Sequence, residues 1–189
     1  VTSQNADFDA LEQKAVLEGD VVMSEAPDKR AVGDRAEIDQ VAGTVLLTGT
    51  SVVLTQGTNE LKGRRLFFNQ SSGKMQLTGN GNGGNSRIKA RFSEGTGKPA
   101  PAAKEPAAAK GMSFGGNFKT DPNAPVEIDA DRLDVDDPAK EAVFTGTVRA
   151  KQGDFILQAS ELKATYTGSN MFGGSDKEKA GQGTAKLTR

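Results

Sequence analysis

The sequence predicts an all-β protein, built as an antiparallel meander of two-strand units that are about 30 residues long. Three observations support this prediction: a motif that repeats at fixed spacing, a two-residue alternation within each copy, and turn residues between the copies. With 189 residues the chain is long enough to bury a hydrophobic core.

The repeat begins with a half-motif of the form apolar, any, small, any, any, apolar, any, apolar. Copies start at Val1, Ala31 and Leu61, which gives a period of 30 residues, and two more start at Ile128 and Leu157. The two successive unrestricted positions break the alternation by one residue, as a β-bulge does. Each copy is therefore predicted to be a bulged strand.

A second half-motif follows four of the copies. An apolar residue comes nine positions after the last apolar position of the copy, and a glycine comes two positions later. These pairs are Leu17 and Gly19, Leu47 and Gly49, Leu77 and Gly79, and Phe144 and Gly146. Strict alternation from Phe144 to Lys151 predicts a half-buried strand, and the glycine indicates a bend or a close backbone approach.

Turn residues separate the expected strands at 26–29, 56–59, 71–74, 136–139 and 152–154. Each unit then contributes two antiparallel strands. Because one such unit cannot enclose a core, the units are expected to stack as a sandwich, jelly roll or β-solenoid.

The meander is expected to be interrupted between about residues 80 and 125. Asn80–Asn85 is a glycine-asparagine loop, and Lys98–Lys110 has the Pro-Ala-Lys composition of a semi-rigid linker. Residues 87–110 carry six Lys or Arg against two Glu, which indicates either a solvated tail or a patch that meets anionic partners. Gly168–Gly183 is expected to be a second, mobile glycine-rich loop.

The composition excludes several classes of function. The chain contains no Cys, His or Trp, so it has no thiol nucleophile, disulfide, Ser-His-Asp triad or His-ligated metal. Its net charge of −1 argues against general nucleic-acid binding, and no apolar run approaches 18 residues. Since the first residue is Val1, the chain is expected to be a mature form or a fragment.

An acidic stretch at residues 129–137 invites a calcium-site interpretation. Leu133 and Val135 interrupt it as strand residues and the central glycine of a calcium loop is missing, so Asp134 and Asp136 are expected on a solvated face. An unrecognised carboxylate pair of a hydrolase stays open as an alternative. No enzyme activity, cofactor or metal is expected.

The apolar positions of the copies are expected to share one inner face, which is either a filled core or a lipid groove. In the first half of the chain these positions are Leu17, Val21, Met23, Ala36, Ile38, Leu47, Val53, Leu61, Leu66, Phe68 and Leu77. In the second half they are Ile128, Leu133, Val135, Phe144, Val148, Phe155, Leu157, Leu162 and Ala164.

Residues 125–136, 142–148 and 152–162 closely resemble the opening of the OstA-like domain, from which the LptA family of periplasmic lipopolysaccharide transport proteins is built. Residues 6–22 and 61–68 look like the later half of the same domain. The resemblance implies a twisted antiparallel β-jelly roll whose interior holds the acyl chains of lipid A. It also implies domains stacked head to tail as a bridge between the two membranes of a Gram-negative envelope.

The resemblance divides the chain into an OstA-like segment at 1–95, a linker at 96–124 and a second OstA-like segment at 125–189. Because the later half comes first, the chain is expected to be either a window from a tandem array or a permuted domain. Open strand edges are then expected near Val1–Phe8 and Ala185–Arg189, where neighbouring chains would join.

The expected function is therefore periplasmic lipopolysaccharide binding and transport. The expected partners are lipid A, other OstA-like domains and further copies of the chain. A structural or adhesive β-repeat module without lipid binding is the alternative. The residues expected to contact acyl chains are Leu17, Val21, Met23, Ile38, Leu47, Leu66, Phe68, Leu77, Ile128, Leu133, Val135, Phe144, Val148, Phe155, Leu157 and Leu162.

Overall fold

A computed structural model describes residues 1–26, 28–79, 87–93 and 124–166 of the chain. Every regular element in these ranges is a β-strand, which confirms the predicted all-β fold. The strands are β1 (Asn5–Asp9), β2 (Lys14–Ala26), β3 (Lys29–Asp39), β4 (Thr44–Gln56), β5 (Asn59–Asn69), β6 (Lys74–Thr78), β7 (Ile88–Phe92), β8 (Val126–Ala130), β9 (Arg132–Asp136), β10 (Glu141–Gln152) and β11 (Phe155–Thr165). None of the described ranges holds a helix with the length and apolarity that a membrane span requires.

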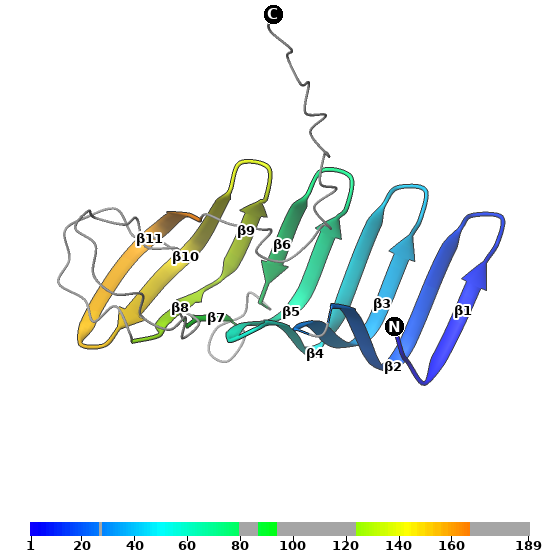
Figure 1. Cartoon of the computed structure of the whole chain (residues 1–189), viewed down its shortest axis with the longest axis horizontal. Helices are drawn as coiled ribbons and strands as arrows, with labels where there is room; N and C mark the ends of the chain where they lie inside the picture. Colours follow the sequence, from blue (N-terminus) through cyan, green and yellow to red (C-terminus); the bar gives the residue numbers. More distant parts are fainter. Residues whose placement is uncertain (27, 80–86, 94–123, 167–189) are drawn as a thin grey trace, which may run out of the picture.

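All these strands join one antiparallel sheet. Its path runs β1-β2-β3-β4-β5-β6-β9-β10-β8-β7, with β11 paired to β10 and with an additional pairing between β5 and β7. In Figure 1 the strands stand side by side along the long axis of the molecule, from β1 at one end to β11 at the other. The predicted meander is confirmed by this antiparallel order.

The long strands bend in the middle and pass from one leaf of the sheet to another. β5 pairs with β6 through Arg65–Asn69 but with β7 through Glu60–Lys62. In the same way, β10 pairs with β9 near its start and with β8 near its end. We call the leaf that contains β1, β6 and β9 the upper leaf, and the leaf that contains β7 and β8 the lower leaf. The interior lies between these two leaves.

The repeated glycines mark this bend, as the sequence indicated. In β2 the pairing register shifts between Glu18 and Val21, and in β10 it shifts between Thr145 and Val148. Both shifts contain two successive residues with positive φ: Gly19 at 77° and Asp20 at 48°, and Gly146 at 81° and Thr147 at 43°. Glycine reaches this left-handed region without steric cost, which explains its place at the start of each of these two bends.

A side chain from the neighbouring strand stabilises the bend of β4. The backbone N–H of Thr50 donates to Asp34 Oδ2 at 2.7 Å, and the Thr50 hydroxyl lies 3.2 Å from the same oxygen. Gly49 lies beside this contact, where an added Cβ would be 2.9 Å from the backbone nitrogen of Asp34. In this copy of the first half-motif, Asp34 at the first of the two unrestricted positions therefore supplies the partner that satisfies a bulged backbone amide.

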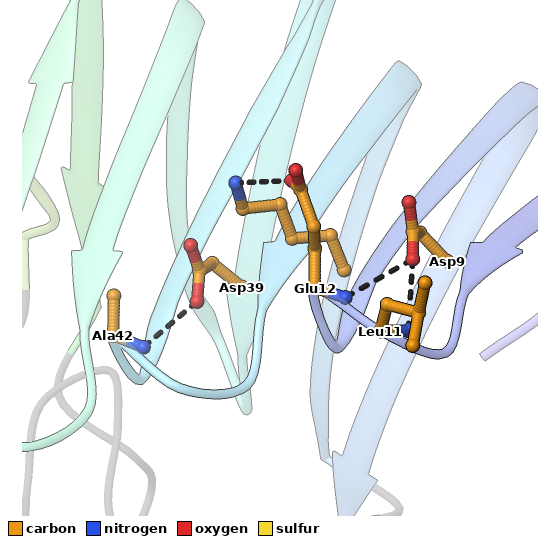
Figure 2. A network of polar contacts seen from close by, with 6 residues as sticks. Asp9, Leu11, Glu12, Asp39 and Ala42 are labelled. Carbon is orange, nitrogen blue, oxygen red and sulfur yellow. Dashed lines mark hydrogen bonds and ion pairs between the residues drawn. The ribbon is translucent and has the colours of Figure 1, made fainter.

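The turns at the edge of the upper leaf, the upper rim, share one design. An Asp or Asn at the end of a strand accepts a backbone N–H from the turn: Asp9 from Leu11 at 2.9 Å, Asp39 from Ala42 at 2.7 Å, and Asn69 from Ser72 at 2.9 Å. Figure 2 shows the first two of these turns side by side. Short polar side chains favour such turns because they replace a backbone acceptor.

The two halves of the chain join in one continuous sheet. β6 pairs with β9 in the upper leaf, with Leu77 opposite Leu133, and β7 pairs with β8 in the lower leaf, with Ala90 opposite Ile128. The guanidinium of Arg87 donates to the backbone carbonyls of Asp129, Gly146 and Thr147, so it ties the start of β7 to the bend of β10. We call this junction the seam.

The range between about residues 80 and 125, where the meander was expected to be interrupted, contains the strand β7, which lies within the predicted segment 1–95. Residues 93–125 connect two paired strands at the place where residues 57–58 and 153–154 form short turns elsewhere. The predicted linker at 96–124, apart from its last residue, lies outside the described residues. The loops at 80–85 and 168–183 and the strand near Ala185–Arg189 also lie outside them.

Candidate lipid-binding interior

Apolar side chains cross the interior in rows that run from strand to strand. One row of the upper leaf passes through paired residues of nine strands, and every member is aliphatic or aromatic. It consists of Ala6, Leu17, Ala36, Leu47, Leu66, Leu77, Leu133, Phe144 and Leu162. A second row crosses the lower leaf through Met23, Ala31, Leu54, Leu61, Ala90, Ile128, Ala150 and Leu157.

Small residues at the third motif position let the two leaves close on these rows. An added Cβ at Gly33 would lie 2.8 Å from Leu47 Cγ, and one at Gly63 would lie 2.7 Å from Leu77 Cδ1. These distances are shorter than van der Waals contact, so each leucine occupies the space that a side chain on the glycine would need. We call this relation the packing rule: in these two units, the small residue of the first half-motif leaves room for the leucine of the second.

The interior is closed in the middle and partly open at both ends. Leu47, Leu77, Leu133 and Phe144 have no exposed surface. Toward the β1 end Leu17, Met23 and Ile38 are half-buried, and toward the β11 end Phe155, Leu157 and Leu162 are half-buried. Leu17, Met23, Leu157 and Leu162 pack against the fully buried cluster.

The sixteen residues predicted to contact acyl chains fall into two groups. Nine lie in the closed middle of the interior: Val21, Leu47, Leu66, Leu77, Ile128, Leu133, Val135, Phe144 and Val148. The half-buried group is Leu17, Met23, Ile38, Phe68, Phe155, Leu157 and Leu162. The structure brings both groups into the space between the leaves, with the exposed surface concentrated in the second group.

One inner-face prediction is wrong. Val53 lies on the outer face, opposite Val32 and Lys62, whereas Val52 and Leu54 are buried. The cause is the bend of β4, where the register of the β4–β5 ladder shifts between Thr48 and Val52 and leaves three residues of β4 outside that ladder. β2 and β10 each leave two residues out, so β4 carries one extra residue and its later side chains change faces.

Sequence reasoning missed part of the interior. Ile88, Ala90 and Phe92 of β7 are buried, as are Val45, Met75 and Val126. The signal in β7 was available, because Ile88–Phe92 alternates strictly between apolar and basic residues. It falls outside every copy of the repeat and was assigned to the interruption.

The interior of the described ranges contains no buried polar or charged side chain. The same ranges hold no group of three or more acidic side chains arranged to bind a metal ion. Tyr166 closes the core beside the β9–β10 turn, where its hydroxyl donates to Asp137 Oδ1 at 2.7 Å. Burial, reinforced by this hydrogen bond, raises the pKa of the Tyr166 phenol far above its usual value.

Comparison with known proteins finds a family similarity in the second part of the chain. Residues 127–188 match the family model of the LptA/(LptD N-terminal domain) LPS transport protein. This segment is LptA-like. It contains β9, β10 and β11, including the half-buried end of the interior. The family resemblance recognised in residues 125–136, 142–148 and 152–162 is therefore confirmed.

Two further proteins are similar to this chain. An uncharacterised protein of Rhizobium meliloti (strain 1021), R00383, is 40% identical over 42 residues, which is 22% of this chain and 23% of that protein. The match thus spans about a quarter of the length of this relative. The crystal structure of LptH, the LptA homologous periplasmic component of the lipopolysaccharide transport device of Pseudomonas aeruginosa, is 15% identical and has a TM-score of 0.49. That likeness covers 85% of this chain and 90% of LptH.

Proposed function

We propose that the protein binds lipopolysaccharide in the periplasm and passes it along a bridge between the inner and outer membranes. The observation that carries this proposal is the apolar interior, which crosses the sheet without a buried polar side chain among the described residues and reaches half-exposed ends. Each methylene group of an acyl chain that enters such a space is stabilised by about 0.8 kcal/mol. The similarity of residues 127–188 to LPS transport proteins is the reason for choosing lipopolysaccharide as the ligand.

The two ends are the proposed entry points for acyl chains. The middle is filled by its own side chains, since Leu47, Leu77 and Phe144 are completely buried. At the β11 end, by contrast, Leu157 and Leu162 belong to the two apolar rows and keep exposed surface. An acyl chain bound at this end would contact Leu157 and Leu162 in the way that apolar side chains of a further strand would contact them.

The same ends are proposed to join neighbouring OstA-like domains, including further copies of this chain. β1 is an edge strand in the described sheet, and its residues are all exposed. β1 and β11 run in the same direction, because nine antiparallel strands cross the upper leaf. A head-to-tail stack that stays antiparallel needs one further strand, and we assign that place to the predicted strand near Ala185–Arg189, outside the described residues.

Site-specific cross-linking to lipopolysaccharide tests the lipid-binding proposal. A photo-reactive residue at Leu157 faces the interior, and the same residue at Gln158 faces outward from the adjacent position of β11. We expect lipopolysaccharide adducts from position 157 and few from position 158. Equal labelling at the two positions, or none, would support the structural or adhesive module instead.

A matched pair of substitutions provides a second measurement. Leu157→Asp places a charge in the half-buried row, whereas Gln158→Asp places it on the outer face. The first substitution should reduce lipopolysaccharide binding at least tenfold and the second should leave it unchanged. Release of a hydrolysed product from lipopolysaccharide, abolished by a single Asp or Glu substitution, would instead favour the hydrolase alternative.

Light scattering over a concentration series tests the assembly. The wild-type chain should form open, concentration-dependent oligomers, because a head-to-tail contact does not close on itself. In the strand predicted near Ala185–Arg189, Thr188→Pro would remove a backbone donor and should weaken assembly without changing the urea midpoint. A chain that stays monomeric at high concentration would contradict the bridge.

A further inference from the structure

Basic side chains gather on the outer face of β5 and β7, away from the interior. Lys62 and Lys89 are paired residues of these two neighbouring strands, and both are exposed. Arg91 follows two positions after Lys89 on the same face. We call Lys62, Lys89 and Arg91 the basic face.

The basic face places like charges directly beside each other. Lys62 and Lys89 face one another across the ladder, an arrangement that destabilises a sheet. Lys62 contacts Glu60 at 2.8 Å, and Arg91 lies opposite the same Glu60 in the ladder, whereas Lys89 forms no ion pair with another described residue. The repulsion is therefore only partly relieved by the described residues themselves.

The carboxylates next to the basic face are outnumbered. On β8, Asp129 lies between Lys89 and Arg149, and Glu127 lies between Arg91 and Lys151. Each of these acids thus has a cation on both sides, and Arg149 and Lys151 continue the positive charge onto β10. With Glu60 of β5 included, the outer surface of the lower leaf from β5 to β10 carries three acids, Glu60, Glu127 and Asp129, against five cations, Lys62, Lys89, Arg91, Arg149 and Lys151.

We propose that this surface docks onto an anionic phospholipid bilayer. A single phosphate would satisfy only the Lys62–Lys89 pair, whereas cations on β5, β7 and β10 are spread over roughly 15 Å at the usual strand spacing of about 5 Å. A plane of lipid phosphates matches that spread, and Lys and Arg near such a surface contribute to binding individually. The interior faces the other side of the leaf, so this docking does not depend on the proposed lipid groove.

Vesicle flotation tests the proposal with the full chain. Vesicles of phosphatidylcholine containing one quarter phosphatidylglycerol should carry the protein, and pure phosphatidylcholine vesicles should not. Binding should fall as salt rises, since the attraction is screened. Equal binding to the two vesicles, or binding to neither, would overturn the proposal; the second result would direct the search to an acidic protein partner.

A charge-matched control separates the basic face from net charge. Lys62→Gln with Lys89→Gln should lower the vesicle partition coefficient by roughly 30-fold, about fivefold for each lysine. Lys14→Gln with Lys163→Gln removes the same charge from exposed lysines on the upper leaf and should change partition less than twofold. All four side chains are exposed, and far-ultraviolet circular dichroism verifies that both variants fold. Equal loss in the two variants would refute the assignment to this face.

Discussion

Gly63→Ala tests whether the third motif position is small because a leucine of the next strand fills its space. The added Cβ would lie 2.7 Å from Leu77 Cδ1, 2.9 Å from Leu77 Cγ and 3.0 Å from the carbonyl oxygen of Thr78. Leu77 has no exposed surface, so it cannot move without displacing its buried neighbours. Overpacking of this kind costs about 1–3 kcal/mol of unfolding free energy.

Urea unfolding measures this cost, followed by far-ultraviolet circular dichroism and by the fluorescence of Tyr166, the single tyrosine of a chain without tryptophan. With a urea slope of about 2 kcal/mol/M, a loss of about 2 kcal/mol lowers the midpoint by about 1 M. Ser3→Ala occupies the same motif position where a Cβ already exists, and it should change stability by less than about 0.5 kcal/mol.

A double-mutant cycle identifies the cause. Leu77→Ala alone should cost about 2–5 kcal/mol because it empties a fully buried site. In that background Gly63→Ala should cost much less, since the atoms it would meet are gone, and the coupling energy should be about 0.5–3 kcal/mol. If Gly63→Ala is neutral in the wild type, or costs the same in both backgrounds, the packing rule is wrong.

Three further outcomes follow from the structure. Burial raises the pKa of Tyr166, so the wild type should lose stability as pH rises above about 10, where the unfolded chain releases the phenolic proton and the folded chain keeps it; Tyr166→Phe should lack this loss in urea titrations at several pH values. Gly146→Ala should lower the thermal midpoint, because φ there is 81° and the new Cβ would meet the side chain of Asp131. Backbone N–H groups of Glu12 and Leu11 lower the pKa of Asp9, so its contribution is present above about pH 4 and is lost as pH falls through its folded value; Asp9→Ala should flatten the acid limb of stability against pH.

Local pattern was enough to predict the strands and most of the inner face. The alternation around Phe144 predicted the strand and its buried positions, and Gly146 predicted the bend. Both predictions succeeded because these features depend on residues that are neighbours in the sequence. The error at Val53 has a different origin: one extra residue at the bend of β4 changes the face, and no local residue type signals it. The pairing of β6 with β9 could not be predicted from local sequence patterns either. The two strands are separated by 53 intervening residues, and their alternating apolar residues are compatible with several pairing registers.

The sequence predicted which side chains face the interior, but it did not predict which of them keep exposed surface. The apolar positions were assigned correctly to one side of the sheet, apart from Val53. Which of them keep exposed surface depends on where the sheet ends and on how closely the leaves pack. The difference between completely buried Leu133 and half-buried Leu162, two members of one row, comes from the single neighbouring strand that Leu162 has among the described residues.

The length of the connection between β7 and β8 affects the order in which the strands of this chain pair during folding. A turn of two residues and a connection of 33 residues join the same kind of strand pair, yet the entropy of loop closure differs by only about 2–3 kcal/mol. Hairpins within 14–69 can form from near neighbours in sequence, whereas closing the seam requires a distant search, so β9–β10–β11 is expected to dock late. The ladders of the described sheet are formed by residues outside 93–125, so we expect sequence inserted between Phe92 and Val126 to slow this docking step and to leave the register of those ladders unchanged.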